Sequence, residues 1–319
     1  MRQASSIGRL GLLAGGLGIG AALACTPGIA SADSPTDPVS WIDELAGGLS
    51  VPAQTTSALD YQVSINGMDL FPTVDNTATA TSGTGDIAIA IGSGANAIAG
   101  GASVGGILPL GGGIGDFAFA DGTDSNADAA VLGGANLDFV AAVGTGSQAQ
   151  AGLGANLDSV IADGTGSHAQ VAIGASHDTA FADGTGSSAE VGLGNHDLAT
   201  ALGTASSATA GGGNYDSATA VSGGVASASE LDASAYADGA NSDAVASGIG
   251  DIASVFNTGS ALDQATASGG DNLIAEIFGT GSTAVAGEGG NWDLAAVFGD
   301  LLDANATGSN FLLDILPSL

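Results

Sequence analysis

The sequence predicts an all-β protein whose chain winds as a parallel β-solenoid, with about 20 residues and two short strands in each coil. Three observations support this fold class. Similar phrases recur along the chain, as in DGTGSHAQVAIGASHD from Asp163 and DGTGSSAEVGLGNHD from Asp183. Within each phrase small apolar residues alternate with polar ones, the pattern of a strand with one buried face. Gly-rich runs such as GTGS separate the alternating stretches and predict turns.

The composition predicts a thin core. Hydrophobic residues make up 45% of the 319 residues, but aromatic residues make up only 4%, and there are 55 Gly. Cores of ordinary domains depend on Leu, Ile and Phe. Because Ala, Val and Ile are the available core residues here, we expect the two strands of each coil to lie very close together.

Positive charge is confined to the start of the chain, where Arg2 and Arg9 are the only Lys or Arg residues. Together with 33 Asp and Glu they give a formal net charge of −31. Such a surface repels phosphate backbones and anionic lipid headgroups. We therefore expect no nucleic-acid partner, and cations or basic partners remain compatible with the charge.

Residues 1–32 have the organisation of a signal peptide. The basic segment MRQASSIGR precedes an apolar stretch that is too short and too Gly-rich for a transmembrane helix. The small residues ASA at 30–32 predict cleavage after Ala32, which implies a secreted or cell-surface protein without a transmembrane segment in the mature chain. The alternative is a lipid anchor at Cys25, the only cysteine.

Residues 33–85 are predicted to form a linker, a short capping helix and a hairpin. In SWIDELAGGL, Ser40 is a candidate N-cap, and Trp41 and Leu45 lie at helical spacing. Further on, YQVSI and MDLF flank Asn66 and Gly67, a pair typical of a two-residue hairpin turn.

Residues 86–300 are assigned to the solenoid, because Asp-initiated units recur there at intervals of about 20 residues. The units start at Asp116, Asp138, Asp158, Asp178, Asp197, Asp216, Asp251, Asp271 and Asp293. Period-two alternation predicts which residues of a unit face inward. The inward set is Val160, Ala162, Ala169, Val171 and Ile173 in one unit, and Ala180, Ala182, Ala189, Val191 and Leu193 in the next. Stacked coils would then pair as parallel strands about 4.8 Å apart.

Residues 301–319 are predicted to form a C-terminal cap, helical like the one around Trp41. An open end of stacked strands promotes aggregation unless it is covered. The apolar segment NFLLDILPSL is the candidate for this cover. The alternative is that it serves as a docking peptide for a secretion or surface partner.

Stacking converts recurring positions into columns, and two of these are candidates for metal binding. Asn or Ser stands two residues before most unit-starting aspartates, which predicts an amide ladder. The next position holds bulky side chains, among them Leu157, Tyr215 and Trp292. In the same column His177 and His196 would lie one coil apart, and two imidazoles at that spacing are weak candidates to share a metal ion.

The unit-starting aspartates form the second candidate metal site. We expect them about 5 Å apart along an exposed corner, where each carboxylate accepts its own turn's N–H and stays solvated. The alternative is calcium bridging between coils, although the repeat lacks the Gly-Gly-x-Gly-x-Asp pattern of calcium-binding β-rolls. The candidate ligands are Asp138, Asp158, Asp178, Asp197 and Asp216.

One column of the first strand is a candidate contact surface. Phe119, Ile161 and Phe181 share a position two residues before Asp121, Asp163 and Asp183, so this parity should face water. Exposed apolar residues on a polar surface mark contact sites, for self-association or for a cell-surface or host partner. The alternative is that the narrow coil reverses parity here and buries these side chains.

No catalytic constellation or cofactor motif is present, so we expect a protein that is not an enzyme. The stretch AIAIGSGANAIAGGASV at 88–104 resembles the head repeats of trimeric autotransporter adhesins. The Ala/Gly/Asp-rich style, the export signal and the absence of Lys are similar to secreted mycobacterial Gly/Ala-rich repeat proteins of unassigned role. These resemblances imply an exported structural or adhesive protein. The alternatives are a calcium-binding solenoid, a polysaccharide-acting enzyme or an ice-binding protein.

Overall fold

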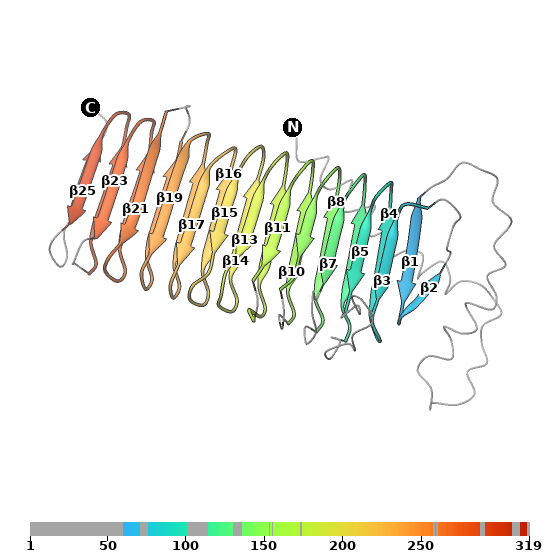
Figure 1. Cartoon of the computed structure of the whole chain (residues 1–319). Coiled ribbons are helices and arrows are strands. Elements are labelled where there is room, and N and C mark those ends of the chain that lie inside the picture. The colour runs from blue at the N-terminus through green and yellow to red at the C-terminus, as the bar shows by residue number, and fades with distance from the viewer. Residues whose placement is uncertain are drawn as a thin grey trace, which may run out of the picture. The chain divides into compact units, whose positions relative to one another are not determined.

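The computed structural model confirms a parallel β-solenoid. It describes residues 60–70, 76–100, 114–129, 136–152, 154, 156–172, 174–257, 259, 261–287, 291–307 and 313–317. The described chain winds through two β-sheets of 14 and 12 strands, called here the large and the small sheet, and each coil contributes one strand to each (Figure 1). The described residues contain no helix. The predicted signal peptide and the predicted helix around Trp41 lie outside them.

Apart from the hairpin β1–β2 at one end of the large sheet, the strands of each sheet follow one another along the rod in chain order. The large sheet contains β2 (Met68–Leu70), β1 (Tyr61–Ile65), β4 (Ile87–Ile91), β6 (Phe117–Asp121), β8 (Phe139–Val143), β10 (Ser159–Asp163), β12 (Thr179–Asp183), β14 (Leu198–Leu202), β16 (Ser217–Val221), β18 (Ser234–Asp238), β20 (Ile252–Phe256), β22 (Ile274–Phe278), β24 (Leu294–Phe298) and β26 (Leu313–Pro317). The small sheet contains β3 (Thr79–Ser82), β5 (Asn96–Ala99), β7 (Asn126–Ala129), β9 (Gln148–Gln150), β11 (His168–Val171), β13 (Ser188–Val191), β15 (Ser207–Ala210), β17 (Val225–Ser229), β19 (Ser242–Ser247), β21 (Asp263–Ser268), β23 (Thr283–Gly287) and β25 (Asp303–Thr307).

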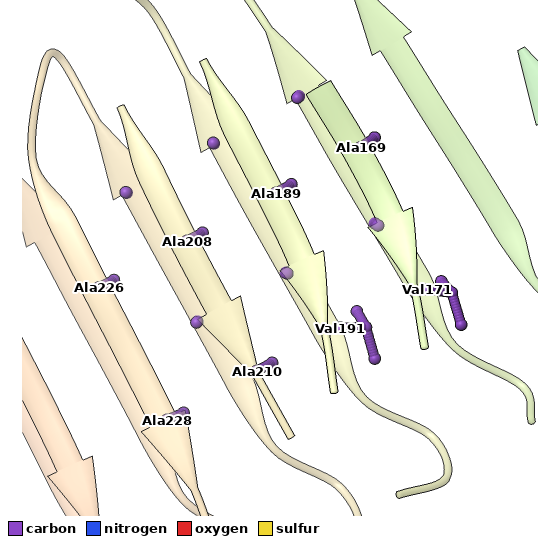
Figure 2. Packing of buried hydrophobic residues seen from close by; sticks show 14 of the residues in the cluster. Ala169, Val171, Ala189, Val191, Ala208, Ala210, Ala226 and Ala228 are labelled. Carbon is purple, nitrogen blue, oxygen red and sulfur yellow. The ribbon is translucent and has the colours of Figure 1, made fainter. Parts of the chain in front are cut away.

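The core between the sheets is built mainly from alanine, as the composition predicted. The inward residues of neighbouring coils stand in register, so that Ala182 pairs with Ala162 on one side and Ala201 on the other. Figure 2 shows the same arrangement in the small sheet, where Ala169, Ala189 and Ala208 form one column. Side chains larger than valine are rare in the fully buried set and are represented by Leu273 and Ile277. Leu193, predicted to face inward, is instead 66% exposed, because the second strand of its coil ends at Val191.

A column of glycines allows neighbouring coils to approach closely at the turns that follow many of the large-sheet strands. Gly184 has φ +128°, and a Cβ there would collide with the carbonyl group of Gly203 in the next coil. The same contact joins Gly144 to Gly164, and Gly164 to Gly184. Because only glycine combines this backbone conformation with the absence of a side chain, the first Gly of GTGS is required by the stacking itself.

The predicted hairpin is confirmed at the N-terminal end of the large sheet. β1 pairs antiparallel with β2 and with β4, and Asn66 and Gly67 between β1 and β2 both have positive φ. The end strand β2 has only three residues. A short edge strand offers little template for pairing with another chain.

The expected boundaries of the solenoid and its helical C-terminal cap are wrong. β3 already belongs to the small sheet at residue 79, and β25 and β26 continue both sheets beyond residue 300. The segment LDILP is a strand that pairs in parallel with β24. The physical reason is that the preceding coil offers a row of otherwise unpaired backbone N–H and C=O groups, which the apolar segment satisfies by pairing as a strand.

Candidate functional site

The recurring Asn-x-Asp corner, which leads into several large-sheet strands, forms a ladder of hydrogen bonds. The Asn136 side chain donates to Asn156 Oδ1 at 2.9 Å, and the Asn195 side chain donates to Asn214 Oδ1 at 3.0 Å. The backbone N–H of His177 donates to the Asn156 carbonyl at 3.0 Å. The predicted amide column is therefore present. One member differs: the Asn156 side chain donates to the Gly154 carbonyl and not to a side chain in the next coil.

The middle residue of the corner turns outward and stacks on its neighbours. Leu157, His177, His196 and Tyr215 have φ between 63° and 65°, a left-handed conformation that points their side chains away from the core. The ring centroids of His177 and His196 lie 4.8 Å apart, and those of His196 and Tyr215 lie 4.9 Å apart with planes at 2°. The two imidazoles meet through their faces, an arrangement that does not aim their nitrogen atoms at a shared ion.

The aspartate column is buried, which corrects the expectation of an exposed corner. Asp138, Asp158, Asp178, Asp197 and Asp216 are each no more than 2% exposed. Their carboxylates also bond differently from the predicted Asx turns. Asp158 Oδ1 accepts the backbone N–H of Asp178 in the next coil at 2.9 Å, and Asp178 Oδ1 accepts that of Asp197 at 2.7 Å.

The register of this column also corrects one predicted unit start. The N–H that Asp251 Oδ1 accepts belongs to Leu273, so Leu273 and not Asp271 occupies the column. In the looser stretch before Asp251, Ala233 occupies it, since its N–H donates to Asp216 Oδ1 at 3.0 Å. The missing unit is therefore a shorter coil that has Ala233 in place of an aspartate at this position.

None of these columns assembles a metal site in the described part of the chain. There, no three His, Cys, Asp or Glu side chains come together in a group that could hold a metal ion. His168, the third histidine, lies on the outer face of the small sheet, in register with Gln148 and Ser188. Calcium bridging along an exposed corner is not compatible with carboxylates that are buried.

The candidate contact residues lie on the outer face of the large sheet, with the predicted parity. Phe119 and Ile161 flank Ala141 in one column, and Ile161 pairs with Phe181 in the next coil. All three of the large side chains are half-buried, whereas Ala118, Ala120 and other residues of the opposite parity form the core. Binding of a partner through these residues remains a prediction.

A longer apolar surface on the same face was missed in the sequence. We call Tyr236, Phe256, Phe278 and Phe298 the aromatic ladder. Phe256 and Phe278 have ring centroids 4.7 Å apart, and Phe278 and Phe298 have centroids 5.2 Å apart, with interplanar angles of 5° and 4°. The phenylalanines are 38–41% exposed. The recurring VFNTG, IFGTG and VFGD were the available signal, because they place Phe at the same distance before successive turns.

The outer face of the small sheet is polar by contrast. Gln150, Gln170, Glu190 and Thr209 stand in one column. The column beside it holds Gln148, His168, Ser188 and Ser207. The two outer faces of the rod therefore differ in chemistry.

The fold places the chain in the class of parallel β-solenoids, and comparison with known proteins adds no closer relationship. No family model, no curated protein and no solved structure matches the chain. Within its described residues, no helix is long and apolar enough to cross a membrane.

Proposed function

We propose that this chain is an exported structural or adhesive repeat protein without catalytic activity, whose contact surface is the outer face of the large sheet. The observation that carries the proposal is the row of apolar side chains along that face. It includes the column through Phe119, Ile161 and Phe181 and, in the later coils, the aromatic ladder.

The physical argument concerns the cost of leaving this row in water. Phe256, Phe278 and Phe298 expose about two-fifths of their surfaces in three consecutive coils, and Ile252, at the other end of the same strand as Phe256, is 38% exposed. Contiguous apolar surface bordered by polar residues favours association. Core positions of the same strands are already filled by Ala253, Val255 and their equivalents, so packing of the coil does not require these rings.

The charge of the chain determines which partners are compatible with this surface. With a net charge of −31, the protein repels other anions. An apolar or basic partner surface, or a second copy once salt screens the repulsion, fits both the apolar row and the charge.

Self-association measured by sedimentation provides the test. Wild-type protein is compared with Phe181→Ser and Phe278→Ser in about 1 M NaCl, where repulsion is screened beyond about 3 Å. Val285→Ser is the matched control, because Val285 is half-buried on the outer face of the small sheet. Melting temperatures are recorded for every variant.

We expect the wild-type protein and Val285→Ser to associate, and both Phe→Ser variants to associate less while they keep a melting temperature close to that of wild type. If Phe181→Ser and Phe278→Ser lower the melting temperature strongly and leave association unchanged, these residues serve the fold and the proposal is wrong.

A further inference from the structure

The buried aspartates form a continuous ladder along one corner of the rod. From Asp86 to Asp216, the Oδ1 atom of each aspartate accepts the backbone N–H at the equivalent position of the next coil, over distances of 2.7–3.1 Å. The last of these N–H groups belongs to Ala233. We call Asp86, Asp116, Asp138, Asp158, Asp178, Asp197 and Asp216 the aspartate ladder. Each member therefore joins two coils through one of its oxygens.

The second oxygen of every ladder carboxyl is buried and has no hydrogen-bond partner among the residues that the structure describes. At Asp86 and Asp197, glycines pack closely against this oxygen. A Cβ on Gly194 would collide with Asp197 Oδ2, and a Cβ on Gly100 would collide with Asp86 Oδ2. The N–H of Leu137 lies near the Asp116 carboxyl but donates its hydrogen bond to the Ile114 carbonyl. A site this tight has room for a proton and not for a metal ion.

The charged neighbours of the ladder do not neutralise it. Its members face one another along the corner, and Glu230 and Asp232 add negative charge beside Asp216. Among the described side chains that influence the ladder, only His177 and His196, which lie beside Asp178, lower the pKa of one of its carboxyls. No Lys or Arg follows Arg9 in the sequence.

Burial and mutual repulsion consequently favour the neutral acid. Burial, reinforced by the neighbouring Asp116 charge, raises the pKa of Asp138 from its ordinary 3.8 to about 7. Burial and the flanking carboxyls raise the pKa of Asp158 and of Asp197 to about 7 as well. Backbone N–H groups act in the opposite direction on each carboxyl, and burial outweighs them.

We propose that the aspartate ladder is a proton-binding column: its enclosed carboxyls hold protons in the folded rod, and their loss toward alkaline pH weakens the stacking of successive coils. A fall in pH would thus stabilise the rod, whereas a protein with salt-bridged carboxylates loses stability as pH falls below about 5. This inference is independent of the proposed contact surface, which lies on a sheet face and not at this corner.

The direction of the pH dependence follows from linkage. A carboxyl whose pKa is higher in the folded than in the unfolded chain binds more protons when folded, so the free energy of unfolding decreases as pH rises. The decrease begins near the unfolded value of 3.8 and is complete above the folded value of about 7. We therefore expect a higher melting temperature at pH 5 than at pH 8.5, with several ladder members contributing.

The decisive experiment compares Asp158→Asn with wild type across this range in high salt. Asn keeps the oxygen that accepts the Asp178 N–H and cannot ionise. Glu190→Gln is the matched control, because it removes one exposed carboxylate from the small sheet. High salt screens the general repulsion among surface acids but acts weakly on buried groups.

We expect the melting temperature of wild type and of Glu190→Gln to fall from pH 5 to pH 8.5 in high salt. The fall should be smaller for Asp158→Asn, so that the melting temperature of this variant rises relative to that of wild type as pH increases. If the wild-type melting temperature is constant or rises with pH, or if Asp158→Asn falls as steeply as wild type, the proposal is wrong.

A direct measurement keeps the proposal testable if the variant folds poorly. Carboxyl carbon-13 resonances of wild-type protein labelled at aspartate report the protonation of each group. A set of aspartates that titrates near neutral pH supports the proposal. Titration of every aspartate below pH 5 overturns it.

Discussion

Substituting two glycines of the same turn tests whether the coils are stacked as closely as the structure indicates. Gly184 and Gly186 both lie between β12 and β13 and both have positive φ, +128° and +64°. A Cβ on Gly184 would collide with the Gly203 carbonyl, whose carbon lies 2.6 Å from the Cβ position, whereas a Cβ on Gly186 meets nothing within 4 Å. Both sites therefore require a backbone conformation that favours glycine, but only at Gly184 would a side chain collide with the next coil.

The expected magnitudes follow from that difference. Gly186→Ala costs only the left-handed conformation, about 1–2 kcal/mol. Gly184→Ala has two costs. The backbone conformation contributes a strain of about 1–3 kcal/mol, and displacing the packed neighbouring coil costs about 1–3 kcal/mol more. For a domain of this size 1 kcal/mol corresponds to about 2–4 °C, so the Gly184→Ala melting temperature should fall roughly twice as far or more.

Thermal unfolding followed by circular dichroism provides the assay, with wild type and both variants measured in one buffer. Midpoints are compared directly, because stacked repeats need not unfold in a single step. Equal losses for the two variants would refute the reasoning, since they would show that the next coil does not lie against Gly184.

Three further predictions concern the core, cations and processing. Ala201→Leu, at a fully buried site between Ala182 and Ala220, should lower the free energy of unfolding by about 1–3 kcal/mol or more in urea unfolding; an unchanged midpoint would mean that the sheets are not closely packed. Calcium should raise the melting temperature no more than magnesium at equal concentration, because the carboxylates of the aspartate ladder are buried; a calcium-specific rise would contradict this. Intact-mass spectrometry of secreted protein should show a mature N-terminus at Asp33, and a diacylated Cys25 would instead indicate a lipid anchor.

The repeat period and the alternation of small apolar residues were sufficient to predict the fold class. Both are local properties of the sequence, and the pairing of Val160 with Ala180 follows once the period is known. The hairpin at Asn66 was predictable for the same reason, because turn chemistry is local.

The burial of the aspartates was not predictable from the same pattern. A polar residue beside a turn ordinarily faces water, and alternation does not say whether the residue before a strand is enclosed by the coils on either side. Only the three-dimensional stack shows that Asp158 bonds to the next coil and not to its own turn.

The end of the chain shows a second limit of sequence reasoning. NFLLDILPSL was expected to form a helical cap, but the strand Leu313–Pro317 forms because β24 presents an unpaired edge. The sequence also suggested that Asp271 starts a unit. In the structure Leu273 takes that position, because its N–H bonds to Asp251 in the preceding coil. In both cases the partner lies in another coil, outside the window in which a local pattern is read.

The measurement that tests the proposed contact surface most directly uses a spin label on each face of one coil. Ser254 in β20 and Thr266 in β21 are both half-buried and lie on the outer faces of the large and the small sheet. Each is replaced by Cys in a Cys25→Ser background, labelled, and adsorbed to alkyl-coated beads. We predict that the label at position 254 loses mobility on adsorption while the label at 266 does not. Equal immobilisation at both positions, or immobilisation at 266 alone, would contradict the assignment of the large-sheet face as the contact surface.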